Sequence, residues 1–343
     1  LDLIDSYGTD ALRFTLAAMA AQGRDIKLAV NRVEGYRNFA TKLWNAARYW
    51  QMNGCVPVDG LRPAGLGQTV NRWIVGALAE TGAKVAEAIE AYKFNEAAGT
   101  LYQFTWGSFC DWYLEFTKPI LAGTDEAAKA ETRATTAWVL DEILHLLHPL
   151  MPYITEELWE QLAEGRANRL ISAGWPEHGP EMIDAAARDE MDWVVRLISS
   201  VRSMRSEMNV PPSAQIPLFL RDAGADSLKR LDTHRDQILR LARLSSVAPL
   251  AGDVPKGAVQ DVLDEATLVL PLEGIVDLDK ERARLGKEIE KHTAEIRKID
   301  AKLGNEQFVA KAPEEVIEEQ RDRRATAEQA RGKLQKALEM LGR

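Results

Sequence analysis

The sequence predicts a mainly α-helical protein that combines a helical bundle, a small α+β domain and a C-terminal antiparallel coiled-coil hairpin. Three observations support this fold class. Long segments with helical apolar spacing fill the first half, strand-like alternation follows position 176, and a heptad-like repeat begins near Leu278. A chain of 343 residues is long enough for two or three folding units.

The first half is expected to form an up-and-down bundle, because its helices are long and their connections are short. Pro149 and Pro152 end a helix, since proline lacks a backbone N–H and its ring clashes with the preceding turn. The helix expected at 30–51 has its apolar face at Val33, Tyr36, Ala40, Leu43, Trp44 and Ala47. The other expected segments are a helix at 10–21 that Gly23 stops, an extended link at 24–29, a loop at 54–67, helices at 68–92, 93–117 and 124–148, and a short helix from Thr155.

The pattern changes after Trp175 and Pro176, where a small α+β domain is expected. Its predicted elements are a helix at 185–207, strands at 214–220 and 267–272, and helical material at 227–241 between the strands.

The last segment is expected to form a hairpin of two helices around a turn at 304–313. Pairing between two chains is the alternative, but a short turn and arms of similar length favour pairing within one chain. The expected seams are Leu285, Ile289, His292, Ile296, Ile299 and Leu303 on the first helix, and Val316, Gln320, Arg323, Ala327, Ala330, Leu334, Ala337 and Leu341 on the second.

Charge and composition limit the possible functions. The formal net charge is −9, which argues against a uniformly basic nucleic-acid-binding domain, although residues 277–343 carry +1. No apolar run could span a bilayer and the first residues do not resemble a signal peptide, so no membrane partner is expected. Cys55 and Cys110 fit neither a disulfide framework nor a zinc site. A cytoplasmic protein is therefore expected.

Several runs of residues resemble known motifs. The run at 7–13 resembles the helix after the KMSKS loop in class I aminoacyl-tRNA synthetases of the Val, Ile and Leu group, and the run at 148–159 fits the same group. The runs that resemble the valyl members lie at 32–48, 92–98, 109–115, 276–281 and 305–313. The chain thus resembles the C-terminal region of the valyl-tRNA synthetase family, most weakly between about 180 and 270.

This resemblance implies a division of the chain into four parts. Residues 1–29 would be the remnant of the segment following the KMSKS loop, and 30–175 the anticodon-binding bundle. Residues 176–275 would be a small α+β linker domain, and 276–343 a coiled-coil tRNA-binding arm. The implied function is that of the tRNA-binding portion of valine–tRNA ligase, a translation enzyme, with tRNA-Val as partner and a monomeric state.

The catalytic Rossmann and editing domains of the family are expected to be missing from this sequence. Neither a HIGH nor a KMSKS signature occurs, and no glycine-rich phosphate loop is present. We therefore expect no catalytic residue and no cofactor here, with ATP and Mg²⁺ used only by the intact enzyme. His145 and His148 are expected to be core residues rather than metal ligands, and the aromatic residues near 104–116 are expected to be core as well.

The helix at 30–51 carries the residues expected to approach the anticodon. Asn38, Lys42, Asn45 and Tyr49 follow one another at steps of 4, 3 and 4 and so share a face. Amides, a cation and an aromatic ring are the groups that read splayed RNA bases. Arg37 and Arg48 are expected to contact phosphates. The equally weighted alternative is an ordinary solvated helix face.

The hairpin carries the residues expected to contact the elbow of the tRNA. At 1.5 Å per residue an arm of about 30 residues is about 45 Å long, which is enough to reach that corner. The alternative is a solvated coiled-coil exterior with salt bridges. Phe308 and Val309 are assigned to packing at the tip, with contact to RNA as the less favoured role. The expected contacts are Arg284, Lys287, Lys291, Lys298, Lys302, Lys311, Arg321, Arg324 and Arg331.

Two other functions are compatible with the pattern. An isoleucyl- or leucyl-type synthetase piece is one, although isoleucyl members usually carry a C-terminal zinc-binding cysteine cluster and leucyl members lack this arm. A non-catalytic coiled-coil interaction module is the other. It differs from a tRNA-binding arm in its response to salt, because affinity based on phosphate contacts falls steeply with ionic strength.

Overall fold

The computed structural model describes residues 1–21, 28–57, 65–163, 165–166, 168–305, 308, 310 and 312–342. These residues divide into two compact units, Leu1–Trp193 and Val194–Arg343. In the part of the chain that the structure describes, no helix is long and apolar enough to cross a membrane.

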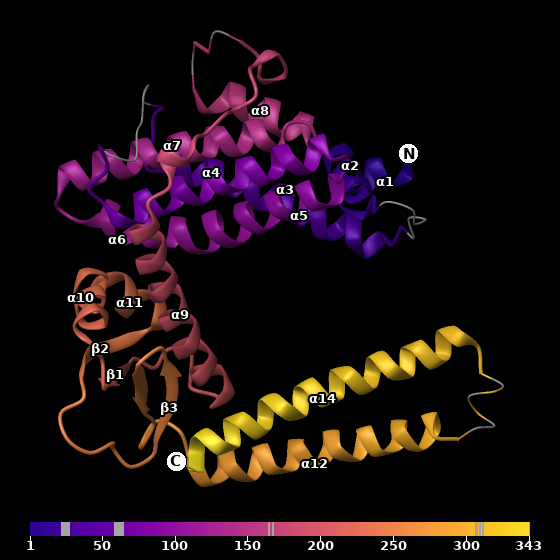
Figure 1. Ribbon diagram of the computed structural model, residues 1–343, viewed down its shortest axis with the longest axis vertical. Helices are drawn as coiled ribbons and strands as arrows, with labels where there is room; N and C mark the ends of the chain where they lie inside the picture. Colours follow the sequence, from indigo (N-terminus) through magenta and orange to yellow (C-terminus); the bar gives the residue numbers. More distant parts are fainter. Residues whose placement is uncertain are drawn as a thin grey trace. The chain divides into compact units, whose positions relative to one another are not determined.

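The first unit is a bundle of helices, as predicted (Figure 1). An additional short helix at the start of the chain escaped prediction, and the helix expected from Thr155 begins three residues earlier, with Pro152 in its first turn. In chain order the helices are α1 (Asp2–Tyr7), α2 (Thr9–Met19), α3 (Val30–Met52), α4 (Thr69–Glu90), α5 (Phe94–Tyr102), η2 (Gln103–Tyr113), α6 (Leu114–Ala122), α7 (Glu126–Leu147) and α8 (Pro152–Leu162). The expected link at 24–29 and the loop at 54–67 lie partly outside the described residues.

The helix expected at 93–117 is one long helical run made of three parts. Its middle part, η2, is a π-helix of 11 residues, a form that is rare and usually much shorter. The run then continues as α6 to Ala122, with Pro119 inside it. The sequence signalled neither the π-helix nor the later end.

The face that α3 turns toward the bundle differs from the predicted one. Val33, Leu43 and Ala47 are buried as expected, but Trp44 is 37% exposed, and its assignment to the apolar face was wrong. Phe39 is fully buried instead, with its ring centroid 5.3 Å from that of Phe14, 5.0 Å from that of Tyr102 and 6.3 Å from that of Trp106. These rings set the rotation of α3 about its axis.

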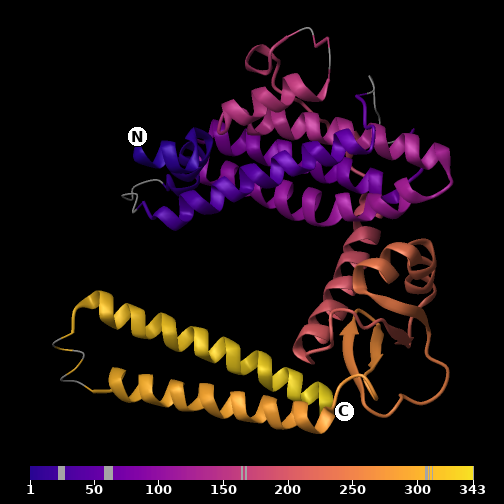
Figure 2. The ribbon, with the colours of Figure 1, turned by 180° about the vertical axis from the view of Figure 1, so that it is seen from behind.

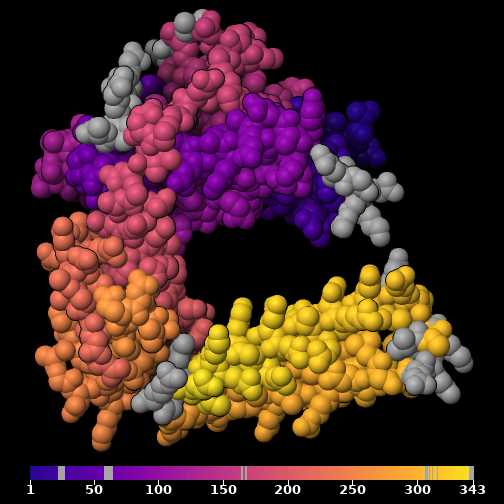
Figure 3. Space-filling view, in the orientation of Figure 1, coloured from indigo at the N-terminus to yellow at the C-terminus, as the bar shows by residue number. Residues whose placement is uncertain are grey.

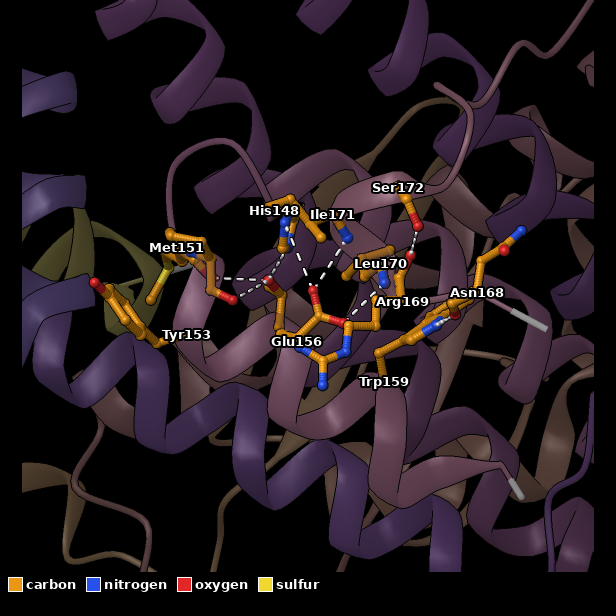
Figure 4. A network of polar contacts seen from close by, with 12 residues as sticks. His148, Met151, Tyr153, Glu156, Trp159, Asn168, Arg169, Leu170, Ile171 and Ser172 are labelled. Carbon is orange, nitrogen blue, oxygen red and sulfur yellow. Dashed lines mark hydrogen bonds and ion pairs between the residues drawn. The ribbon is translucent and has the colours of Figure 1, made fainter. Parts of the chain in front are cut away.

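A polar network holds α8 in place (Figure 4). Asp10 of α2 accepts hydrogen bonds from the backbone N–H groups of Tyr153 and Ile154, at 3.3 and 2.6 Å, and so satisfies the free donors of the helix start. Nδ1 of His148 lies 2.8 Å from the Thr155 hydroxyl. The Glu156 carboxylate accepts from the N–H groups of residues 170 and 171. Residues of the run at 148–159 therefore connect the start of α8 to α2 and to the backbone at residues 170 and 171.

The second unit contains the end of α9 (Ala185–Glu207), a four-stranded sheet, two short helices and a hairpin. The strand order is β2-β1-β4-β3, with β1 and β2 parallel and the other pairs antiparallel. Figure 2 shows the strands and the hairpin of this unit from behind. The bounds are β1 (Ile216–Arg221), α10 (Ala225–Thr233), α11 (Arg235–Ala242), β2 (Leu244–Pro249), β3 (Ala258–Leu263) and β4 (Ala266–Pro271). The sequence predicted β1, β4 and the helices between them but missed β2 and β3.

The C-terminal helices, α12 (Leu278–Leu303) and α14 (Glu314–Gly342), pair within the chain as the predicted hairpin (Figure 1). The buried seam residues include Leu285, Ile296 and Ile299 on α12 and Ala327 and Ala337 on α14. Ion pairs that cross between the two helices flank this seam, at 2.9 Å between Arg323 and Glu295 and 2.5 Å between Arg324 and Asp300.

The network around α8 predicts a dependence of stability on pH. Burial lowers the pKa of His148 below its ordinary value of 6.5, against the opposing effect of Glu156. The folded state therefore binds the proton less readily than the unfolded state, so stability is fully present above pH 6.5 and is lost as pH falls through the folded pKa. His148→Gln, which keeps a polar partner for Thr155, is expected to reduce this loss.

Urea unfolding followed by tryptophan fluorescence at pH 7.5 and pH 5.5 tests this prediction, because all 9 tryptophans lie in residues 1–193. His292→Gln, in the second unit, serves as the control and is expected to leave the dependence unchanged. An equal loss of stability in wild type and His148→Gln would contradict the assignment to His148.

Candidate nucleic-acid interfaces

The outer surface of α3 carries two neighbouring stripes of polar side chains. The inner stripe is the predicted set Asn38, Lys42, Asn45 and Tyr49, and the outer stripe consists of Arg37, Thr41, Trp44 and Arg48, again at steps of 4, 3 and 4. Six of these residues are exposed, and only Lys42 and Tyr49 are half-buried. The outer stripe therefore faces solvent more completely than the predicted one.

The two half-buried members of the inner stripe contact the bundle. The Lys42 ammonium lies 2.7 Å from an Asp111 carboxylate oxygen and 5.4 Å from the ring centroid of Trp106, both in η2. The hydroxyl of Tyr49 lies 2.8 Å from that of Thr117 in α6, and Thr117 is buried. A ring held in this way is poorly placed to stack on a base. Both side chains instead link α3 to the long helical run beside it.

The outer stripe combines an exposed indole ring with two guanidinium groups. Trp44 follows Arg37 by two helical turns and precedes Arg48 by about one, so all three side chains point in similar directions. An aromatic ring between cations suits a single-stranded RNA, because the ring can stack on a base while the cations bind phosphates. Trp44 was not predicted as an RNA contact, although the same 4-3-4 spacing signals this stripe too.

On the hairpin, the predicted basic residues of α12 lie along one line. Arg284, Lys287, Lys291, Lys298 and Lys302, here called the basic stripe, follow at steps of 3, 4, 7 and 4. Each residue advances about 100° around a helix, so Lys287 lies on the opposite side of α12 from the buried Leu285. The stripe therefore faces away from the seam with α14.

Ion pairs divide these basic residues into two groups. Arg284 donates to the 6% exposed Glu281 at 2.9 and 3.0 Å, and Glu281 also accepts from Asn209 before the sheet. Burial acts to raise the pKa of Glu281, but the hydrogen bonds from Arg284 and Asn209 outweigh it and hold the pKa below its usual value. Glu281 thus joins the base of the hairpin to Asn209, and Arg284 neutralises its charge.

Other predicted contacts also have acidic neighbours. Lys291 lies 3.6 Å from Glu288, and Arg324 pairs with Asp300 and with Glu328. By contrast, no acidic group among the described residues lies within ion-pairing distance of Lys287, Lys298, Lys302 or Arg321, and all four are exposed. These four are the basic side chains best placed to bind phosphate.

The remaining predicted hairpin residues give less information. Arg331 is half-buried, and Phe308 is half-buried at the tip. Lys311 and Val309 lie outside the described residues.

Across the described part of the chain, no group of three or more His, Cys, Asp or Glu side chains could hold a metal ion. Nδ1 of His145 lies 3.0 Å from the Asp141 carbonyl oxygen, and its ring centroid is 4.7 Å from that of Trp159.

The amino-acid sequence of this chain matches known protein families in both units. Residues 71–220 match the family model described as the anticodon-binding domain of tRNA ligase, and residues 277–342 match the valyl tRNA synthetase tRNA binding arm. A valine–tRNA ligase of Caulobacter vibrioides is 54% identical over 99% of this chain, and one of Rhizobium meliloti is 51% identical over 98%. The chain belongs to the valyl-tRNA synthetase family.

This membership confirms the predicted resemblance and disfavours the isoleucyl and leucyl alternatives. The chain spans 38% of the length of the Caulobacter ligase and 36% of the Rhizobium ligase. Among solved structures, a LeuRS–tRNA complex from Agrobacterium radiobacter K84 matches 74% of this chain and 29% of its own length, with 15% identity and a TM-score of 0.41. The stripes of α3 precede the residues matched by the anticodon-binding model, whereas the basic stripe lies within the match to the arm.

The contacts of α3 predict which substitutions affect stability. Tyr49→Phe removes the hydroxyl that faces buried Thr117, and we expect it to lower the free energy of unfolding by about 0.5–1.5 kcal/mol. Asn45→Ala, on the same stripe but exposed, is expected to change it by less than about 0.5 kcal/mol. Urea unfolding followed by tryptophan fluorescence measures both. Equal effects of the two substitutions would show that Tyr49 does not link α3 to α6.

Proposed function

We propose that this chain is the tRNA-binding portion of a valine–tRNA ligase, in which the first unit binds the anticodon side and the hairpin binds the elbow of tRNA-Val. The observation that carries this proposal is the match of the hairpin to the valyl tRNA-binding arm, together with exposed basic side chains on α12 that have no acidic partner among the described residues. The relatives that align over nearly the whole chain are valine–tRNA ligases, which supports valine as the specificity.

Binding, rather than chemistry, is the role proposed for these residues. The sequence contains neither a HIGH nor a KMSKS signature, so we expect no aminoacylation by this chain alone. In the intact enzyme, ATP, Mg²⁺ and valine would be used by the catalytic domain. Contacts far from the reacting end contribute by orienting the acceptor end and by discriminating among tRNAs.

The outer stripe of α3 is the proposed base-binding surface of the first unit. Trp44 is exposed and lies between Arg37 and Arg48, whereas Tyr49 and Lys42 are engaged within the bundle. Asn38 and Asn45, both exposed beside the outer stripe, supply amide groups for base edges. Lys42 and Tyr49 are proposed to position α3 instead of touching RNA.

The basic stripe of α12 is the proposed phosphate-binding surface of the arm. An overall charge of −9 requires phosphate binding to be local, and a line of cations on the outward side of a helix satisfies that requirement. Of its five members, Lys287, Lys298 and Lys302 have no acidic partner among the described residues that binding would displace, so they should contribute most to the salt dependence.

Substitution of the outer stripe tests the anticodon side. We expect Trp44→Ala to weaken binding of the tRNA-Val anticodon stem-loop by about 5- to 150-fold, because loss of one base stack costs about 1–3 kcal/mol. Trp44→Phe should retain most of the affinity, and Tyr49→Phe should leave it unchanged. Fluorescence anisotropy with a labelled stem-loop measures all three. Unchanged affinity in Trp44→Ala would exclude this residue from the interface.

The salt dependence of tRNA binding tests the arm. The chain should bind tRNA-Val in preference to tRNA-Ile and bulk tRNA, and removal of residues 278–343 should weaken the binding. Replacing Lys287, Lys298 and Lys302 by Ala should reduce the slope of log K against log [salt] by about 2–3, since each lost phosphate contact contributes about 0.7–0.9.

A triple substitution of Lys84, Lys93 and Lys118 to Ala makes the same change in charge in the first unit and is the matched control. We expect it to leave the slope close to that of the wild type. Binding that is insensitive to salt and to loss of the α12 lysines would instead favour the coiled-coil interaction module.

A further inference from the structure

A cavity of about 510 Å³ opens on the first unit between α4 and the segment after α8. Its α4 side is lined by Gly82, Ala83 and Ala86, where hydrogen and methyl groups leave room beside the helix. Pro149 and Trp175 belong to its walls. Cavities of about 300–1,000 Å³ are the usual size of small-molecule sites.

The wall opposite α4 is held in place by contacts of its own. Nε2 of His178 lies 3.0 Å from a Glu142 carboxylate oxygen of α7, and the His178 ring packs edge-on against Trp138 at 5.2 Å between centroids. Pro176 lines the same wall and restricts its backbone. Because these contacts fix the wall independently of any occupant, the cavity is preformed.

The charged side chains that line the cavity are acidic. Glu90 and Glu177 both line the cavity and are exposed, whereas no Lys or Arg of the described residues contributes to the lining. Among the described residues, neither carboxylate has a basic group within ion-pairing distance. The indole of Trp175 is 40% exposed beside them. Tryptophan is the side chain that attracts a cation most strongly through its ring face.

We propose that this cavity binds a small organic cation with a flat apolar body, of the aryl-alkyl amine class. The small residues of α4 would receive the apolar body, Trp175 would contact it or its cationic group, and Glu90 and Glu177 would balance the positive charge. Phosphate groups are repelled by the same carboxylates, so this site is separate from the proposed tRNA contacts. The compact volume favours a small molecule over an extended peptide segment.

Three indole compounds that differ mainly in charge test the proposal on the 343-residue chain. Tryptamine is the cationic probe, tryptophol the neutral one and indole-3-acetate the anionic one. Calorimetry gives the affinities, and ¹⁹F spectra of the chain labelled with 5-fluorotryptophan locate the site, with the Trp175 signal assigned by Trp175→Phe. We expect tryptamine to bind at least tenfold more tightly than indole-3-acetate and to shift the Trp175 signal.

Substitutions in and beside the cavity separate charge from shape. Glu90→Gln combined with Glu177→Gln should bring tryptamine and tryptophol within about twofold of each other. Ala83→Leu, at an exposed position on the α4 side, should weaken both at least tenfold. Glu87→Gln removes a carboxylate from the same helix outside the cavity and should leave the preference intact. Circular dichroism confirms that each variant remains folded.

Three results would overturn the proposal. They are binding of the anion as tight as that of the cation, saturable binding without a shift of the Trp175 signal, and no binding of tryptamine. If a lysine-rich peptide shifts the Trp175 signal while tryptamine does not, the occupant is a protein segment and the small-molecule assignment is wrong. None of these results bears on tRNA binding, so the two proposals are tested independently.

Discussion

The rings packed around Phe39 fix the rotation of α3, and the candidate RNA surface of the first unit depends on that rotation. With Phe39 fully buried against Phe14, Tyr102 and Trp106, the opposite side of the helix must face solvent. Trp44 is exposed for this reason, and Lys42 is brought to the edge where Asp111 neutralises it. Burial of apolar rings thereby selects which polar groups remain available for a ligand.

A similar selection operates on the hairpin through ion pairs (Figure 3 shows its exterior). Arg324 pairs with Asp300 across the two helices, and Arg284 pairs with Glu281 of the same helix near the base of the hairpin. Lys287, Lys298 and Lys302, on the outward side of α12, have no such partner among the described residues, and their charge is available to phosphate. A protein with a net charge of −9 can thus present a local cationic line without being basic as a whole.

The cavity beside α4 follows from the same bundle but offers the opposite chemistry. Its carboxylates and Trp175 favour a cation, whereas the outer stripe of α3 and the basic stripe of α12 favour an anionic polymer. Small residues on α4 and a fixed wall at His178 leave room that a larger side chain would fill. The proposed ligand of the cavity is therefore distinguished from RNA by charge as well as by size.

The sequence by itself determined the long helices, the hairpin and the family, because apolar periodicity and contiguous motifs are local properties of the chain. Only the tertiary structure decided how α3 is rotated, since its apolar residues are compatible with two overlapping faces and the choice depends on rings from other helices. The short strands β2 and β3 lack a clear alternating pattern and are defined by pairing with β1 and β4. Arg284 and Lys291 pair with acids three residues before them in the same helix, so these pairs follow from local spacing, whereas the pairing of Arg324 with Asp300 across the hairpin was decided by the tertiary structure.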